Sequence, residues 1–167
     1  LLGMVIEKAT GENLSDYLSQ NLWKPMNMQH DALWQLDSKE SGMEKAYRCI
    51  ASNARDFARF GKLYKNNGQW NGKQLLSPEF VKQSTKPRFK DSPQYGYGFW
   101  LSDYKDKDIF YMRGIHGQYV IVIPEDDLII VRLGENLIKK DKDEEHAPDF
   151  YKYIDETYKM LNDVANN

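Results

Sequence analysis

The chain has 167 residues, of which 41% are apolar, 13% aromatic and 29% charged, and its formal net charge at pH 7 is −2. This length and composition suit one globular domain with a core of its own. The nearly balanced charge gives no sign of a nucleic-acid or anionic-membrane partner, and no apolar run approaches the roughly 18 residues that cross a bilayer. The single cysteine, Cys49, excludes an internal disulfide and a thiolate metal site.

The first residues have the pattern of an amphipathic helix. Leu1, Leu2, Val5 and Ile6 recur at helical spacing, and Thr10-Gly11 predicts the helix end. Neither an initiator methionine nor a signal segment precedes this helix in the sequence. We therefore expect the chain to be a piece of a longer protein.

Two more helices are predicted in the first half of the chain. One covers residues 14–23 and has Asn13 or Ser15 as its cap. The clearest one lies within residues 52–68, with Ser52 or Asn53 as its cap and Asn67-Gly68 at its end. Near the start of this helix, Arg55 and Asp56 are interpreted as ion-pair or cap partners rather than as catalytic groups.

The second half predicts strands between helices. A helix begins at Ser77 and Pro78, a strand covers residues 94–103, two more strands run through residues 111–134 around a turn at residues 124–127, and a last helix covers residues 149–165. Consecutive strands with short turns predict an antiparallel sheet, and the helices must cover its faces. The predicted fold class is α+β.

Most common catalytic motifs are missing. His30, His116 and His146 are far apart in the sequence, with no His-x-x-x-His or Cys-x-x-Cys pair, so no metal site is predicted. The sequence has no phosphate-binding glycine loop and no Gly-x-Ser-x-Gly motif. No cofactor is predicted.

The segment Arg-Gly-Ile-His-Gly-Gln, residues 113–118, is unusual because two glycines interrupt the approach to an apolar strand. Gly114 and Gly117 would let a ligand lie against the backbone, where N–H groups could stabilise an oxyanion. The same glycines also fit a β-bulge in which they only relieve strain. The residues alone favour the bulge and leave both interpretations open.

Several longer segments carry a family resemblance. They are LLGMVIEKATGENLSDYLSQNLWKPMNM, NARDFARFGKLYKNNGQWNGKQLLSPEFV, YGYGFWL and GIHGQYVIVIPEDDLIIVRLG. In this order they resemble the C-terminal portion of the serine β-lactamase and penicillin-binding-protein-like hydrolases, in the class C β-lactamase and esterase group. The resemblance covers nearly the whole chain, and Gly-Ile-His-Gly-Gln is most similar to the 6-aminohexanoate-dimer hydrolase branch.

The resemblance implies a β-lactamase/transpeptidase-like fold in which residues 1–167 are the C-terminal portion of one catalytic domain. It implies that Gly114 is the signature glycine beside the catalytic serine and that the backbone N–H of Ile115 helps to form the oxyanion hole. We take as candidate substrate-binding residues Arg113, His116, Gly117, Tyr97 and Trp100, although aromatic residues on a strand equally suit a core.

The chain departs from the family pattern in two places. Met112 and Arg113 stand where a Lys-Thr or His-Ser/Thr pair is expected, which argues against a β-lactam substrate. SDYL, SNAR and SPEF lack the lysine of the family's Ser-x-x-Lys nucleophile motif, and Ser41 has Lys45 four residues on instead of three. We therefore expect the nucleophile and the general-base tyrosine to lie upstream of Leu1.

The sequence thus predicts part of a serine hydrolase that cleaves small amides or esters through an acyl-enzyme, with this chain inactive alone. Its partners would be the small-molecule substrate and the missing N-terminal half of the same protein. Because family members are often exported in bacteria, the resemblance implies a periplasmic or secreted parent. The alternative is a non-catalytic binding or regulatory relative on the same fold.

Overall fold

The structure is a computed structural model that describes residues 1–135 and 145–165. The chain forms two compact units, Leu1–Arg59 and Phe60–Asn167. Several helices in these units begin or end at the cap residues that the sequence predicts.

The first unit contains the predicted opening helices. α1 covers Leu2–Thr10 and ends at Gly11, whose φ of 75° is left-handed. α2 covers Leu14–Leu18 and continues as a π-helical turn over Ser19–Trp23. Asn13, one of the two predicted caps, accepts a hydrogen bond from the Asp16 N–H at 2.8 Å. Two short antiparallel strands follow, β1 (Leu33–Trp34) and β2 (Ile50–Ala51).

Asp56 ties the start of the third helix, α3 (Ala54–Lys65), to the segment after α2. The carboxylate is fully buried and accepts hydrogen bonds from the backbone N–H groups of Gln29 and His30 at 2.8 and 3.1 Å. It also accepts from Asn53 Nδ2 at 2.6 Å and from an Arg59 guanidinium nitrogen at 2.8 Å. The predicted structural role of Asp56 is confirmed, and Asn53 is the helix cap.

The second unit opens with a hairpin and a short helix. β3 (Gln69–Trp70) and β4 (Lys73–Gln74) pair antiparallel. α4 covers Pro78–Ser84, and the Ser77 hydroxyl accepts from the Phe80 N–H at 3.1 Å, as the Ser-Pro pair predicts.

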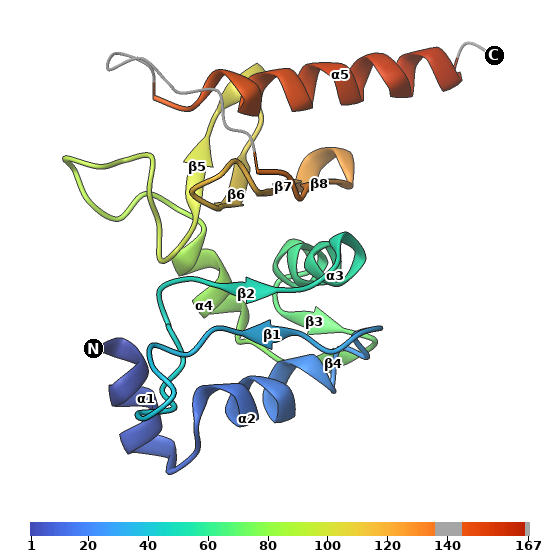
Figure 1. Ribbon diagram of the computed structural model, residues 1–167. Coiled ribbons are helices and arrows are strands. Elements are labelled where there is room, and N and C mark those ends of the chain that lie inside the picture. The colour runs from blue at the N-terminus through green and yellow to red at the C-terminus, as the bar shows by residue number, and fades with distance from the viewer. Residues whose placement is uncertain (136–144, 166–167) are drawn as a thin grey trace. The chain divides into compact units, whose positions relative to one another are not determined.

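The main sheet of the second unit has four strands in the order β5-β6-β7-β8, all antiparallel (Figure 1). The strands are β5 (Trp100–Ser102), β6 (Ile109–Arg113), β7 (Tyr119–Ile123) and β8 (Leu128–Arg132). Neighbours in the sequence are neighbours in the sheet, so the predicted antiparallel α+β arrangement is confirmed.

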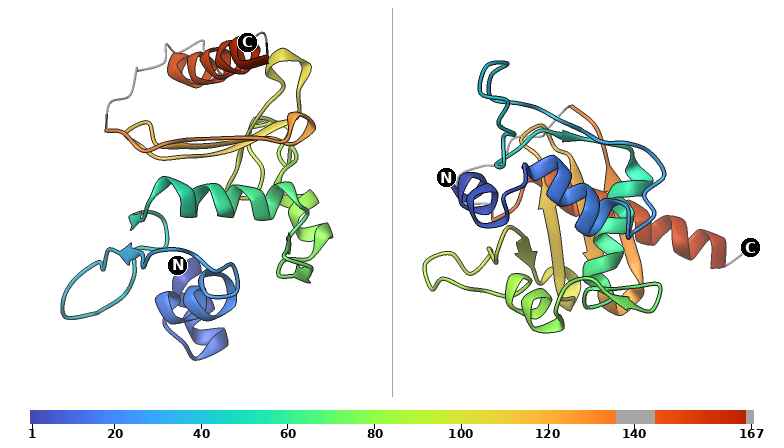
Figure 2. Two further views of the ribbon diagram at one scale, coloured as in Figure 1. Left: turned by 90° about the vertical axis from the view of Figure 1, so that its right-hand side faces the viewer. Right: turned by 90° about the horizontal axis from the view of Figure 1, so that it is seen from below.

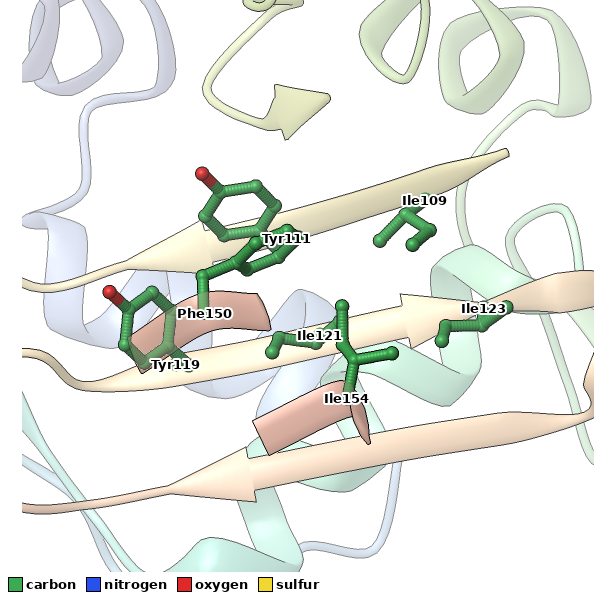
Figure 3. Packing of buried hydrophobic residues seen from close by; sticks show 7 residues of the cluster. All are labelled: Ile109, Tyr111, Tyr119, Ile121, Ile123, Phe150 and Ile154. Atoms are coloured by element: carbon green, nitrogen blue, oxygen red, sulfur yellow. The ribbon is translucent and has the colours of Figure 1, made fainter. Parts of the chain in front are cut away.

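Helices cover both faces of this sheet (Figure 2). On one face, alternate residues of β6 and β7 pack against Phe150 and Ile154 of α5, which covers Pro148–Ala165 (Figure 3). On the other face, Phe110 and Val122 pack with Tyr64 near the end of α3 and with residues of α4 and β5. Because strand residues alternate between faces, β7 is buried along its whole length.

The strand predicted over residues 94–103 is mostly wrong, because β5 begins only at Trp100. The preceding backbone contacts α4 instead: the Tyr97 N–H donates to the Ser84 carbonyl at 2.9 Å. A Cβ atom on Gly96 would lie 2.1 Å from the same carbonyl oxygen. Gly96 is therefore a close-approach glycine beside the end of α4, while its own N–H donates back to the Phe99 carbonyl at 2.9 Å.

Substitution of Tyr119 by Phe should lower the free energy of unfolding by about 1–3 kcal/mol. The buried Tyr119 hydroxyl donates to Asp149 at 2.9 Å, near the start of α5. Burial, reinforced by this bond, raises the pKa of Tyr119, so its proton stays in place at neutral pH. Urea unfolding would measure the loss, with Tyr47→Phe at an exposed tyrosine as the control. Equal midpoints for Tyr119→Phe and the wild type would contradict the role of this bond.

Candidate functional site

The turn between β6 and β7 has a defined hydrogen-bond pattern. The Gly114 N–H donates to the Gln118 carbonyl at 2.8 Å, and the Gly117 N–H donates to the Gly114 carbonyl at 3.1 Å. Gly117 has a φ of 78°, whereas Ile115 and His116 do not have positive φ values. This is a three-residue hairpin loop in which a type I turn is followed by a left-handed glycine that forms a bulge. The bulge interpretation therefore describes Gly117 correctly.

The same turn sets the direction of the Ile115 N–H. This N–H belongs to the peptide group whose carbonyl, on Gly114, accepts the bond that closes the turn. In a planar trans peptide the C=O and N–H point in opposite directions, so the Ile115 N–H points away from the turn. Within residues 1–135 and 145–165, no acceptor is bonded to it, and Ile115 is 75% exposed. The turn thus presents an available backbone donor.

The Gln118 side chain lies where a Cβ atom on Gly114 would be. A Cβ atom on Gly114 would lie 2.2 Å from Gln118 Oε1 and 3.0 Å from its Cβ. The amide of Gln118 crosses this space: its oxygen accepts from the His116 N–H at 3.2 Å, and its nitrogen donates to the Gly134 carbonyl at 2.7 Å. Gln118 therefore connects the turn to the chain just after β8.

Arg132, the last residue of β8, holds the turn from another side. Its guanidinium donates to the carbonyls of Gly117 at 2.6 Å and His116 at 3.2 Å. The guanidinium carbon also lies 5.7 Å from the centre of the Tyr153 ring on α5. The sequence predicted neither Arg132 nor Gln118 as a site residue. The only signal for Arg132 was a charge at the end of an apolar strand.

The other predicted site residues form two separate sets of contacts. The Arg113 guanidinium lies 5.6 Å from the centre of the Trp100 ring, and Trp100 makes an edge contact with Tyr95. Trp100 also packs against the core cluster under α5, as a core aromatic would. Tyr97 is 52% exposed and lies 4.4 Å from the guanidinium carbon of Arg88.

The chain does contain one Ser-x-x-Lys sequence, Ser102 to Lys105, which contradicts the expectation that this motif occurs only upstream of Leu1. Ser102 ends β5, and Lys105 has a φ of 62° and pairs with Asp155 at 2.9 Å. Ser102 is also opposite Ile109, at the end of β6 away from the turn and about 13 Å along the strand from Arg113, where the turn begins. The motif is therefore not organised as a nucleophile at this turn.

A Tyr-x-Asn sequence, Tyr64 to Asn66, is also present, but its tyrosine belongs to the core. The Tyr64 ring lies 4.5 Å from that of Phe99, between centroids. Burial raises the pKa of Tyr64 to about 12, so it is not suited to act as a base at neutral pH.

The described residues contain neither a cluster of metal-ligating side chains nor a helix that could span a membrane. In residues 1–135 and 145–165, no group of three or more His, Cys, Asp or Glu side chains is placed to hold a metal ion. Over the same part of the chain, no helix is long and apolar enough to cross a membrane.

Comparison with known proteins gives consistent matches. The profile of the family described as Beta-lactamase matches residues 1–150. A curated relative, 6-aminohexanoate-dimer hydrolase from Paenarthrobacter ureafaciens, is 26% identical over 80% of this chain and 36% of its own length. The chain therefore spans about a third of that relative.

Solved structures support the fold. A Bacillus anthracis protein, provisionally described as a 6-aminohexanoate-dimer hydrolase, superposes with a TM-score of 0.76 at 24% identity. The superposition includes 96% of this chain and 40% of the Bacillus anthracis chain. A provisionally described β-lactamase from Bacteroides dorei DSM 17855 gives a TM-score of 0.66 at 18% identity, over 92% of this chain and 54% of its own. The two likenesses establish the fold.

Proposed function

This chain belongs to the Beta-lactamase family, and on that premise we propose that it forms the oxyanion-hole wall of a serine hydrolase that cleaves small amides or esters. The observation that supports this role is the outward-pointing Ile115 N–H, which has no acceptor among the described residues. The names of the family and of its curated relative point to a hydrolase of the β-lactamase superfamily.

The proposed reaction proceeds through an acyl-enzyme. A serine oxygen bonds to the substrate carbonyl carbon and passes its proton to a nearby base, while the carbonyl oxygen becomes an oxyanion. The Ile115 N–H would donate to that oxyanion. When the carbonyl re-forms, the bond to the amine or alcohol breaks and the leaving group takes the proton. Water then releases the acid in a second step of the same kind.

The nucleophile is proposed to lie upstream of Leu1, with residues 1–167 as the C-terminal portion of one catalytic domain. The placement of Ser102 and Tyr64, which are not arranged as nucleophile and base at the turn, supports this view. On this proposal the chain alone is inactive, and its partner is the N-terminal half of the same protein.

Small amides or esters are the proposed substrates. The curated relative is named as a hydrolase of the 6-aminohexanoate dimer. In this chain the family's expected Lys-Thr pair is replaced by Met112 and Arg113, and the Arg113 guanidinium lies against Trp100. A cation held in this way is a poor counterpart for the lysine that would receive a β-lactam carboxylate.

A serine-reactive fluorophosphonate would test the proposal on the full natural gene product. Intact mass spectrometry before and after treatment, with peptide mapping, should find one adduct on a serine upstream of Leu1. Residues 1–167 expressed alone are the matched control and should take no adduct. An adduct on Ser102, or none on the full product, would overturn the proposal, and the second result would favour the alternative of a non-catalytic binding or regulatory relative.

A further inference from the structure

Two consecutive peptide groups connect the Arg132 side chain to the Ile115 N–H. Arg132 donates to the carbonyl of His116, which belongs to the His116–Gly117 peptide group. The N–H of that same group donates to the Gly114 carbonyl. The Gly114 carbonyl in turn belongs to the group that carries the Ile115 N–H. Hydrogen bonds and peptide groups thus form a continuous series from the Arg132 guanidinium to the Ile115 N–H.

This series fixes a direction. Each peptide group is planar, so a bond to its oxygen and a bond from its nitrogen together set its orientation. Arg132 restrains the His116–Gly117 group, and that group restrains the Gly114–Ile115 group. The same guanidinium nitrogen also donates to the Gly117 carbonyl at 2.6 Å, so two successive carbonyls of the turn share one donor.

The series also strengthens the donor. A hydrogen bond to a carbonyl polarises its peptide group and makes the N–H of that group a better donor, so hydrogen bonds in a chain reinforce one another. Here the first donor carries a full positive charge, and a charge-assisted hydrogen bond polarises its acceptor more than a neutral donor does.

The guanidinium itself has little freedom to leave this place. The Tyr153 ring of α5 lies on one side of it, and the backbone of Gly134 lies so close that a Cβ atom there would be 2.4 Å from the guanidinium carbon. Gln118 holds the Gly134 carbonyl at the same time. The chain just after β8 and the Tyr153 ring of α5 therefore both restrict the position of the Arg132 guanidinium beside the turn.

We propose that Arg132 is a positioning residue that orients and polarises the Ile115 N–H through these two peptide groups. The inference rests on the proposed function, since it assigns a purpose to the donor of that same site. Arg132 itself would not touch the substrate.

A substitution series at Arg132 separates charge from packing. Lys keeps the charge, Gln keeps a neutral donor, and Met keeps only the apolar stem. In the full natural protein, Arg132→Met should lower kcat by about tenfold and leave KM within twofold of the wild type. Arg132→Gln should lower kcat less. Arg132→Lys should keep kcat within about threefold of the wild type. Arg48→Met is the matched control, because Arg48 also lies over a tyrosine ring but is far from the turn in sequence and exposed.

A second measurement does not depend on activity. In an amide NMR spectrum of the same proteins, the Ile115 proton should move upfield in the order Arg132→Lys, Arg132→Gln, Arg132→Met, as the polarisation is lost. An Ile115 resonance that does not change in any of these variants would overturn the inference, and so would a kcat that depends on stem size rather than charge. If Arg132→Met does not fold, the comparison of Lys with Gln decides the matter. Failure of serine labelling in the wild type would refute the proposed function while leaving the NMR test of Arg132 intact.

Discussion

Substitution of Ile115 by Pro is expected to lower kcat of the full natural protein by about 10²–10³, the usual effect of removing one oxyanion-hole donor. Proline has no N–H, so the variant deletes the proposed donor itself. Ile115 occupies the second position of the turn, where proline is favoured, and its N–H makes no bond that the fold needs among the described residues. The turn should therefore survive.

The matched control for this substitution is Ile115→Ala. Alanine removes the exposed side chain but keeps the N–H, so kcat should stay within a few-fold of the wild type. Steady-state hydrolysis of a small activated ester would measure both variants, and thermal unfolding would check that each is folded. If the proline variant were as active as the alanine variant, Ile115 would not be the oxyanion donor.

Removal of the Asp56 carboxylate is expected to cost about 3–5 kcal/mol of unfolding free energy at pH 7. The change Asp56→Ala would leave the N–H groups of Gln29 and His30 and the side chains of Asn53 and Arg59 without their shared acceptor. Urea unfolding would measure the loss, and faster amide hydrogen exchange at Gln29 and His30 would place it in the first unit. Asp31→Asn, at an exposed aspartate, should change stability by less than about 0.5 kcal/mol.

The contribution of Asp56 should also depend on pH. Burial acts to raise the pKa of this carboxyl, but the hydrogen bonds from Gln29, Asn53, His30 and Arg59 together outweigh it and leave the pKa below its ordinary value. A carboxyl with a lowered folded-state pKa stabilises the fold above the unfolded-state value, near 3.9, and this stabilisation disappears as the pH falls through the folded-state pKa. The difference between wild type and Asp56→Ala should therefore shrink below about pH 4. A difference that stays constant down to pH 2 would show that the charge on Asp56 does not matter.

Local chemistry in the sequence determined much of the fold. Asn13, Asn53 and Ser77 cap helices because a side-chain oxygen can reach an N–H only three residues away. The turn after β7 followed from residues close together in the chain, and an antiparallel sheet followed from the short connections. The sequence predicted two strands over residues 111–134, whereas the structure has three, β6, β7 and β8, because a turn between Gly114 and Gly117 separates β6 from β7. The family resemblance was also readable from collinear segments, and the profile match bears it out.

Tertiary contacts decided what local chemistry could not. The segment before Trp100 resembled a strand, but its Tyr97 N–H bonds to the end of α4. The Ser102 and Lys105 pair satisfies a catalytic spacing, yet its serine ends a strand and its lysine turns to Asp155, because spacing alone does not place two residues on one face.

The candidate site shows the same division most clearly. Gly114 and Gly117 could be singled out from the sequence, because a buried strand normally carries bulky residues and glycines there indicate a bulge or a close contact. Gln118 bonds to Gly134, and Arg132 to Gly117, across 16 and 15 positions of the chain. Such contacts exist only once β7 and β8 are paired and α5 lies over them. The sequence by itself thus determined that the two glycines give this segment a particular local structure. Only the tertiary structure decided which side chains bond to the turn and in which direction the Ile115 N–H points.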